Sequence, residues 1–380
     1  MSDTQAHSGC VSDVDHDRNL PEVDLLAPLT LRGVTLRNRI VVSPMCQYCA
    51  VDGMPDDWHL VHLGSRAVGG AGLVFTEATA VMPEGRITPG DTGIWNAEQA
   101  NFFGRIAKFI HRLGAVAGIQ LAHAGRKASC QQPWLGGASL KTAAEGAWQT
   151  VAPSALPFND GDPLPHALSE DEIAQIKQAF VAATRRSIEV GFRVIELHAA
   201  HGYLMHEFLS PLTNQRTDRY GGTLENRMRI VLETAEAMRA IIPNDDVLMV
   251  RISATDWVEG GWDVEQSIEL SKALGKIGVD LIDVSSGAII PKATIPVGKN
   301  YQVPLADAIR KQAGIKTGAV GMITEALQAN EIITSGAADL VFIAREMLRE
   351  PYWALKAEAA LQEEPTWPTQ YGYAVHRRKR

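Results

Sequence analysis

Residues 170–198 read EDEIAQIKQAFVAATRRSIEVGFRVIELH, a long amphipathic stretch followed by a short apolar run. Ser169 lies just before it and Glu172 follows three residues later, a capping-box spacing that predicts the start of a helix. The β-branched run Val194–His198 predicts a buried strand. A helix that leads into a buried strand is the repeating unit of an α/β fold.

The same unit recurs along the chain from Leu25 to about Leu361. The predicted strands are Ile40–Pro44, Gly72–Thr76, Val116–Leu121, Val194–His198, Val247–Ser253, Leu281–Ser285, Gly318–Gly321 and Leu340–Ala344. The predicted helices are Trp58–Val68, Ala97–Leu113, Glu170–Val190, Leu224–Ile242, Val264–Lys276, Pro304–Lys311, Thr324–Ser335 and Tyr352–Leu361. Eight strands that alternate with eight helices predict a single (β/α)8 TIM barrel. The alternative is a doubly wound open sheet, but its GxGxxG motif is absent after the first strand, where Ser43-Pro44-Met45-Cys46 stands instead.

Two segments interrupt this alternation. Leu29–Leu36 predicts a hairpin that turns at Gly33 and forms a lid on the N-terminal face of the barrel. Gly125–Leu168 is a long loop after the third strand, and it would lie at the C-terminal face, where barrel active sites are found. We therefore expect a disordered N-terminal arm over residues 1–24, the barrel over residues 25–362 and a C-terminal tail over residues 363–380.

The composition is that of a globular protein, with 46% hydrophobic and 21% charged residues among 380. The formal net charge of −8 argues against a nucleic-acid binder and against a protein that rests on an anionic membrane. Every apolar run falls short of the ~20 residues that span a bilayer. Four cysteines are too few for a disulfide scaffold and fit a reducing compartment, so the cytoplasm is the expected location.

Strand side chains alternate between two faces, which places several polar residues on the barrel axis. In the fourth strand this pattern points Glu196 and His198 inward. The same parity points inward Gln120, Arg251 and Asp283. One interpretation is a structural layer in which Arg251 neutralises Glu196 or Asp283, because buried charges must be paired. The other is a ligand site, which suits Gln120, His198 and Arg251 because they lie at or near the C-terminal ends of their strands.

His198-Ala-Ala-His201-Gly-Tyr203 brings two imidazoles and a phenol off the fourth strand within six residues. A zinc site would need a third ligand, and none is spaced to match, so we expect no metal. Helix capping and surface histidines are a second interpretation. The third is an active site in which imidazole N–H donors hold a developing enolate oxygen while an acid protonates carbon.

The pair Cys46-x-x-Cys49 follows the first strand. A zinc or iron–sulfur site would want two more thiols, but Cys10 and Cys130 lie apart, in the arm and in the long loop. We interpret Cys49 as an inert buried thiol and keep Cys46, at the end of the strand, as a functional candidate.

Val320-Gly-Met322 and Ala344-Arg345 follow the seventh and eighth strands. Barrels often bind a phosphate at this place, through backbone N–H groups and a nearby cation. Beside the histidine cluster, these segments suggest a phosphate-bearing cofactor.

Residues 197–227 read LHAAHGYLMHEFLSPLTNQRTDRYGGTLENR, and this run resembles the core motif of the Old Yellow Enzyme family of flavin-dependent ene-reductases. Further matches extend from about Leu26 to Tyr371, and the chain is most similar to the bacterial branch of thermophilic-type enzymes and xenobiotic reductases. The resemblance implies that FMN binds noncovalently at the top of a (β/α)8 barrel. It also implies NADPH or NADH as the hydride donor.

The resemblance assigns roles to residues of this chain. The positions that would contact the flavin, its ribityl chain or its phosphate are Ser43, Pro44, Met45, Cys46, Ala78, Gln120, Arg251, Ser286, Gln302, Gly321, Met322, Ala344 and Arg345. The positions that would contact the substrate are Tyr48, Lys127, His198, His201 and, in the tail, Tyr373. Cys46 would tune the flavin potential and Arg251 would stabilise the anionic reduced flavin. Tyr203 would be the proton donor.

The implied activity is that of an NADPH dehydrogenase of the ene-reductase type. In its ping-pong cycle NAD(P)H reduces the flavin and leaves, and an activated alkene then binds in the same place. Flavin N5 delivers hydride to the β-carbon, and Tyr203 protonates the α-carbon. The implied substrates are α,β-unsaturated carbonyl or nitro compounds, with nitrate esters as a further class.

The expected partners are these small molecules, and neither nucleic acid nor a membrane. A homodimer or higher homo-oligomer is also expected. Many relatives end in Gln-Tyr-x-Arg, whose Arg reaches the neighbouring subunit's active site, but this chain has Gln370-Tyr371-Gly372-Tyr373. Completion of the pocket by a second subunit would therefore depend on Tyr373 or on Arg377.

Two other FMN barrels are alternatives, as is a barrel without catalytic activity. A dihydrouridine synthase would need a basic RNA-binding surface and an extra C-terminal domain, which this acidic chain does not offer. A dienoyl-CoA reductase would need an iron–sulfur cysteine cluster and a further large domain. A non-catalytic barrel would leave the polar cluster without a use.

Overall fold

The computed structural model describes residues 23–361 and 363–375. Eight parallel strands close into a barrel in the order β10-β11-β12-β3-β4-β5-β8-β9. These strands are β3 (Ile40–Val42), β4 (Leu73–Ala80), β5 (Val116–Ala122), β8 (Val194–Ala199), β9 (Val247–Ser253), β10 (Leu281–Ser285), β11 (Lys316–Val320) and β12 (Leu340–Ile343). All eight predicted strands are confirmed, with bounds that differ by a few residues. Apart from Val23 and Asp24, the arm predicted over residues 1–24 lies outside the described residues.

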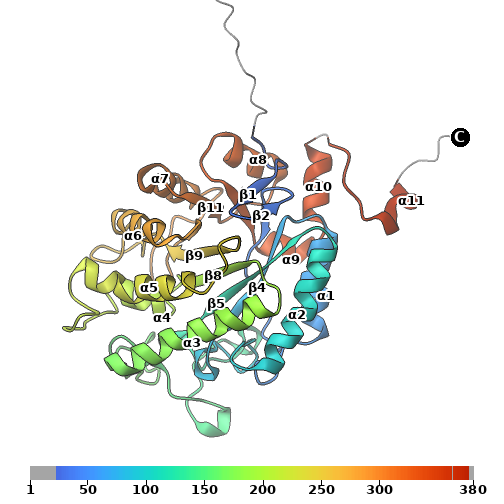
Figure 1. Cartoon of the computed structure of the whole chain (residues 1–380). Coiled ribbons are helices and arrows are strands. Elements are labelled where there is room, and N and C mark those ends of the chain that lie inside the picture. The colour runs from blue at the N-terminus through green and yellow to red at the C-terminus, as the bar shows by residue number, and fades with distance from the viewer. Residues whose placement is uncertain (1–22, 362, 376–380) are drawn as a thin grey trace, which may run out of the picture.

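Helices surround the barrel and alternate with its strands (Figure 1). The predicted helices are confirmed as α1 (Asp57–Val68), α2 (Ala97–Arg112), α3 (Glu170–Glu189), α5 (Leu224–Arg239), α6 (Val264–Ile277), α7 (Val303–Ala313), α8 (Ala326–Thr334) and α10 (Trp353–Ala360). Two short helices, α4 (Leu204–Leu209) and α9 (Arg345–Arg349), are additional and directly follow the candidate residues of β8 and β12. The predicted capping box is present, because the Ser169 side chain accepts from the Glu172 N–H at the start of α3.

The hairpin of β1 (Leu29–Leu31) and β2 (Val34–Leu36) packs against the N-terminal ends of the barrel strands. The Gly33 N–H donates to the carbonyl of Asp245, just before β9, at 3.0 Å. A Cβ at Gly33 would lie 2.7 Å from the Cβ of Asp245, so this close approach requires glycine. The hairpin thus lies on the face where the lid was predicted.

Side chains inside the barrel form two layers. Next to the hairpin the interior is apolar, and this layer contains Val41, Leu73, Phe75, Val194, Val247, Met249, Leu281, Leu340 and Phe342. Towards the C-terminal ends of the strands the inward side chains are polar and buried, among them Gln120, Glu196 and Arg251. A larger apolar cluster fills the space between the strands and the helices, while inside the barrel the apolar layer packs one end and the polar layer is the floor of the candidate site.

The long loop after β5 is ordered by short elements. It contains three 3-10 turns, η2 (Gly125–Lys127), η3 (Pro133–Leu135) and η4 (Ala143–Glu145), and a two-stranded pair, β6 (Val151–Ala152) with β7 (His166–Ala167). The Arg126 guanidinium donates to the Ile289 carbonyl, which follows β10. The loop therefore lies at the C-terminal face, as predicted.

The tail beyond α10 ends, among the described residues, in η5 (Thr369–Tyr371) and α11 (Gly372–Val375). Figure 1 shows α11 standing away from the barrel. The Tyr373 side chain is 89% exposed. In the described ranges, no helix is both long enough and apolar enough to cross a membrane.

Candidate active site

Two polar pairs on adjacent strands form the floor of the site. Gln120 Nε2 donates to Glu196 Oε1 at 2.8 Å, and Arg251 Nε lies 3.1 Å from Asp283 Oδ2. Each pair faces across neighbouring strands in register, so the predicted inward orientation is confirmed. Burial raises the pKa of the Glu196 and Asp283 carboxyl groups, and Arg251 opposes this shift in both. The ion pair predicted for Arg251 is formed with Asp283.

His198 lies near the end of β8, with a ring that is buried and neutral. Burial, and next the charge of Arg251, lower its pKa well below the ordinary value. Its Nδ1 accepts the Ala200 N–H at 3.2 Å, so the ring proton lies on Nε2. The result is an N–H donor that keeps its proton without carrying a charge.

His201 follows in a left-handed backbone conformation, with a φ of 60°. Its N–H donates to Ser253 Oγ at 2.9 Å, and its Nε2 lies 2.7 Å from Ser285 Oγ. Its ring centroid is 5.2 Å from that of His198 in an edge-to-face arrangement. Burial lowers its pKa as well, so the site holds two neutral imidazoles.

Tyr203 occupies the N-cap position of α4, and its ring centroid lies 5.1 Å from that of His198. Burial, with the nearby Cys46 and Tyr48 side chains, raises the pKa of its phenol well above the ordinary value. Lys127 Nζ lies 5.2 Å from the centre of the same ring and donates to the His201 carbonyl at 2.8 Å. The phenol therefore stays protonated beside the two histidines.

Cys46 and Tyr48 lie near each other on another side of the site, and each affects the pKa of the other and of Tyr203. Burial raises the pKa of Cys46 well above the usual thiol value, so Cys46 is a thiol and not a thiolate. The backbone between them is anchored, because the Gln47 N–H donates to Glu77 Oε2 at 2.8 Å.

Cys49 is half-buried, not fully buried as predicted, and burial raises its pKa to about 11. Its sulfur lies 3.8 Å from His59 Nε2. Both nitrogens of that ring face carboxylates, those of Asp56 and Glu77. Cys49, Asp56 and His59 lie close enough together to be possible metal ligands, but both nitrogens of the His59 ring already face carboxylates.

A pocket of about 300 Å³ lies at the C-terminal ends of β11 and β12. Its lining includes the predicted residues Gln302, Gly321, Met322, Ala344 and Arg345. Ser286 Oγ donates to Gln302 Oε1 at 2.5 Å, and Gln302 Nε2 donates to the Val320 carbonyl at 2.9 Å. The Arg345 side chain is exposed and its Nη2 lies 3.4 Å from Met322 Sδ, so its charge is available to an anion.

Three comparisons agree on what this chain is similar to. The model of the NADH:flavin oxidoreductase / NADH oxidase family matches residues 24–364. The chain belongs to this family.

An NADPH dehydrogenase of Halalkalibacterium halodurans is 46% identical to this oxidoreductase over 355 residues, covering 93% of this chain and 99% of the relative. Among solved structures, morphinone reductase matches with a TM-score of 0.74 and 27% identity, covering 90% of each chain. The old yellow enzyme homologue from Zymomonas mobilis matches with a TM-score of 0.74 and 28% identity, covering 90% of this chain and 94% of that one. The resemblance to old yellow enzymes is thereby confirmed, and with it an FMN-dependent oxidoreductase that uses NADH or NADPH.

The residues of the oxidoreductase fit an FMN molecule. The buried Ser43 Oγ has no hydrogen-bond partner among the described residues, so it can take one from a bound molecule. Gly321 has a φ of +113°, and a Cβ there would lie 2.5 Å from Gln302 Nε2, so the pocket needs its open backbone. The pocket and Arg345 offer backbone and cationic groups where a phosphate is expected.

The predicted site residues fall into three sets. One lies around the imidazoles and comprises Tyr48, Lys127, His198, His201 and Tyr203. A second comprises the end of the first strand and the barrel floor, with Ser43, Pro44, Met45, Cys46, Ala78, Gln120 and Arg251, where Ala78 pairs in register with Gln120. The third is the phosphate pocket with Ser286 beside it. Tyr373 joins none of them within this chain, because α11 stands apart.

Ser253 and Ser285 bind His201 and were not predicted. Their strand parity could have found them, because each lies two residues after an inward side chain, Arg251 or Asp283. His206, in α4, was also missed. Its partner is Asp256, fifty residues away, and no short spacing signals that contact.

Proposed function

We propose that this oxidoreductase reduces the C=C bond of α,β-unsaturated carbonyl or nitro compounds. The observation that carries the proposal is the cluster of two neutral imidazoles and one protonated phenol, with ring centroids 5.1–5.2 Å apart. These groups donate protons and hydrogen bonds without bringing a charge of their own. That is the chemistry required where negative charge develops on an oxygen next to the reacting alkene.

When bound, FMN supplies hydride chemistry, accepting hydride from NAD(P)H and delivering it to the β-carbon of the alkene. The Arg251 guanidinium at the barrel floor would hold the negative charge of the reduced state. Cys46 would contribute a neutral thiol, since its raised pKa keeps it protonated. The imidazole and phenol donors line a single site. NAD(P)H and the alkene would therefore bind at the same place in turn, which is a ping-pong cycle.

His198 and His201 would bind the carbonyl or nitro oxygen of the substrate. The Nδ1 of His198 accepts the Ala200 N–H, so the ring carries its proton on Nε2. The Nε2–H is the donor that His198 would offer to the substrate oxygen. As hydride reaches the β-carbon, charge grows on the oxygen, and a donor placed beforehand stabilises it in the transition state more than in the ground state.

Tyr203 would then protonate the α-carbon. Its raised pKa makes it a weak acid in water, but an enolate carbon is a stronger base than a phenolate. Lys127, 5.2 Å from the ring, places a positive charge near the phenolate that results.

The test is to change each histidine to alanine and to follow the two half-reactions separately by stopped-flow absorbance. We expect His198→Ala and His201→Ala to slow reoxidation by 2-cyclohexenone about 100-fold or more, the usual effect of losing one oxyanion donor. Reduction by NADPH should change only severalfold. His166→Ala, on the exposed strand β7, is the control. An equal loss in both half-reactions would contradict the role of the two histidines.

We also propose a homo-oligomer in which α11 packs on a second subunit. The support is the exposed Tyr373 and the position of α11 away from the barrel. Because α11 stands away from the barrel, Tyr373 lies apart from the site of its own chain. Its substrate contact would therefore be made in the site of a neighbouring subunit. Nitro compounds and nitrate esters are further candidate substrates. The proposed location is the cytoplasm, because the chain carries a net negative charge and few cysteines.

A further inference from the structure

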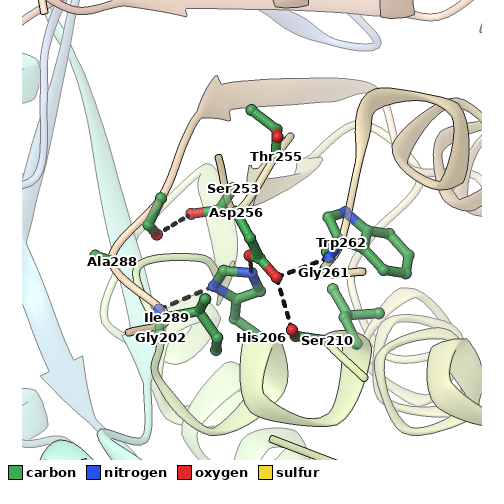
Figure 2. A network of polar contacts seen from close by, with 12 residues as sticks. Gly202, His206, Ser210, Ser253, Thr255, Asp256, Gly261, Trp262, Ala288 and Ile289 are labelled. Carbon is green, nitrogen blue, oxygen red and sulfur yellow. Dashed lines mark hydrogen bonds and ion pairs between the residues drawn. The ribbon is translucent and has the colours of Figure 1, made fainter. Parts of the chain in front are cut away.

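A buried histidine–carboxylate contact, His206 with Asp256, lies beside Gly202, the residue between His201 and Tyr203 (Figure 2). His206 is in α4, and its Nε2 lies 2.9 Å from Asp256 Oδ1. Its Nδ1 accepts the Gly202 N–H at 2.9 Å. Both side chains are fully buried, and neither was assigned a role above.

Asp256 fixes which nitrogen of His206 carries the proton. The other oxygen of its carboxylate accepts from Ser210 Oγ at 2.6 Å and from the Trp262 N–H at 2.7 Å. Burial opposes ionisation, but the contacts with His206, Ser210 and Trp262 outweigh it and lower the pKa of Asp256. An ionised carboxylate only accepts, so the His206 Nε2 must donate and its Nδ1 keeps the lone pair that Gly202 needs.

Gly202 lies directly between His201 and Tyr203. The backbone is left-handed at both His201 and Gly202, with φ values of 60° and 72°. A Cβ at Gly202 would lie 2.2 Å from the Ala288 carbonyl oxygen, so the turn is pressed against the loop after β10. Glycine adopts this conformation freely, but a residue with a side chain such as His201 keeps it only where surrounding contacts hold it.

The Tyr203 N–H donates to the Ala200 carbonyl at 3.2 Å, and among the described residues three side chains bind the backbone of the turn. His206 binds the Gly202 N–H, Ser253 Oγ accepts the His201 N–H, and Lys127 Nζ bridges the carbonyls of His201 and Ala288 at 2.8 and 3.1 Å. Lys127 comes from the proposed substrate face, and Ser253 ends a barrel strand. Of these three side chains, only that of His206 comes from α4, the helix that has Tyr203 at its N-cap.

We propose that His206, oriented by Asp256, is a positioning residue that fixes the His201–Tyr203 turn and so aims the imidazole and the phenol at the substrate. The inference rests on the proposed function, because it concerns the geometry of that same site. Placement matters, since a displacement of ~1 Å at a reacting group lowers the rate by up to ~100-fold.

Two substitutions separate the two contacts of His206. In His206→Asn the side-chain oxygen lies where Nδ1 was and can still accept the Gly202 N–H, while the contact with Asp256 is lost. In His206→Gln the amide nitrogen lies where Nε2 was and can still donate to Asp256, while the Gly202 contact is lost. Each variant leaves one buried partner of His206 unpaired, Asp256 in His206→Asn and the Gly202 N–H in His206→Gln, so thermal unfolding of both is measured beside the kinetics.

The readout is reoxidation of the NADPH-reduced enzyme, measured anaerobically with 2-cyclohexenone and with ferricyanide. Ferricyanide takes single electrons and needs neither an oxygen donor nor protonation of carbon. We expect His206→Gln to slow reoxidation by the enone ~10- to 100-fold while leaving the ferricyanide rate close to wild type. We expect His206→Asn to keep most of the enone rate, which is rescue by the variant that retains the turn contact.

Ser210→Ala is the control, because it removes a donor to Asp256 without touching the turn. Equal enone rates in the two His206 variants, or parallel losses with enone and ferricyanide, would overturn the inference and leave the proposed function standing. If the wild-type enzyme reacts with ferricyanide but not with enones, the proposed function itself fails.

The tautomer can be read in the wild-type protein, whatever the stability of the variants. ¹⁵N NMR of histidine-labelled enzyme should show His206 as a neutral ring protonated on Nε2. A proton on Nδ1 would overturn the inference, because Nδ1 could not then accept from Gly202.

Discussion

At the scale of single residues, burial sets the protonation of the groups proposed to react. The same desolvation keeps Tyr203 protonated and His198 neutral, since it disfavours the charged form of each. A site built in this way offers proton donors that are present over a wide pH range. It also excludes an imidazolium as the group that binds the substrate oxygen at neutral pH.

Tyr203→Phe tests the proton donor. The substitution removes the hydroxyl and keeps the ring, so the packing against His198 remains. We expect reoxidation by 2-cyclohexenone to fall about 10²- to 10⁴-fold, the range for loss of a general acid, with NADPH reduction little changed. Single-turnover absorbance at each step measures this, and a near-normal enone rate would mean that another group protonates the carbon.

The pH dependence of the wild-type enone step follows from the same pKa. Because the pKa of Tyr203 is raised, its proton is retained as the pH rises through about 10, where an ordinary tyrosine loses it. The enone step should therefore keep its proton donor up to about pH 10. Loss of the Lys127 charge near pH 8, where burial lowers its pKa, should reduce the rate only severalfold, and abolition of the enone step near pH 8 would contradict Tyr203 as the donor.

Single residues could be predicted where a motif or a strand parity marked them. His198, His201 and Tyr203 were found from one run of six residues, and Gln120 and Arg251 from inward parity. His206 and Asp256 could not be found in this way, because the contact joins a helix to the loop after β9. Cys49 was placed too deep, because the residue type alone does not fix exposure in a loop.

At the scale of elements, the connections after β11 and β12 shape the phosphate pocket. Gly321 follows β11 directly, and its φ of +113° lets the chain turn around Gln302. A residue with a Cβ at position 321 would have a strained backbone, and its Cβ would enter the pocket. Such strain costs about 1–3 kcal/mol for one residue.

Gly321→Ala should therefore lower the affinity for FMN by about tenfold or more without unfolding the barrel. Fluorescence titration of the apoprotein with FMN measures the affinity, and far-UV circular dichroism reports the fold. Gly314→Ala is the matched control, because Gly314 also has a positive φ but a Cβ there meets no atom within 4 Å. Equal FMN affinities for the two variants would show that the pocket does not bind the cofactor through this turn.

The alternation of strands and helices could be predicted from the sequence, because each strand is a continuous apolar run and each long helix has an amphipathic face. Helices α4 and α9 escaped prediction because each is short and follows a strand without a capping signal in its sequence. The order within the Gly125–Leu168 loop also escaped it. That order depends on single contacts such as Arg126 to the Ile289 carbonyl, which join parts of the chain far apart in sequence.

At the scale of the whole molecule, an apolar layer with a hairpin closes one end of the barrel and polar residues occupy the other. The polar end includes carboxyl groups buried at a cost in stability. Glu207, in α4, accepts the Arg126 N–H at 2.9 Å, while its Oε2 has no hydrogen-bond partner among the described residues. Burial raises its pKa to about 8.

Glu207→Gln should change how the stability of the protein depends on pH. In the unfolded chain the glutamate ionises near pH 4.3, but in the folded protein it stays protonated up to about pH 8. The wild type therefore loses stability as the pH rises through this window, by at most about 1.4 kcal/mol per pH unit. The Glu207→Gln variant lacks this contribution, so the difference between the two unfolding free energies should shift steadily from pH 5 to pH 8.

Urea unfolding at four pH values measures that difference. Glu98→Gln, on the exposed start of α2, is the control and should run parallel to the wild type. A difference that does not change with pH would show that Glu207 is ionised in the folded protein.

We infer that this flavin oxidoreductase passes hydride from NAD(P)H to an activated alkene at the His198, His201 and Tyr203 cluster. The most direct measurement is an anaerobic visible spectrum of the purified protein, recorded alone, after one equivalent of NADPH and again after 2-cyclohexenone. We expect a yellow protein that bleaches with NADPH and recolours with the enone. Bleaching without recolouring would contradict alkene reduction, and a protein that stays colourless after FMN is added would contradict the cofactor site itself.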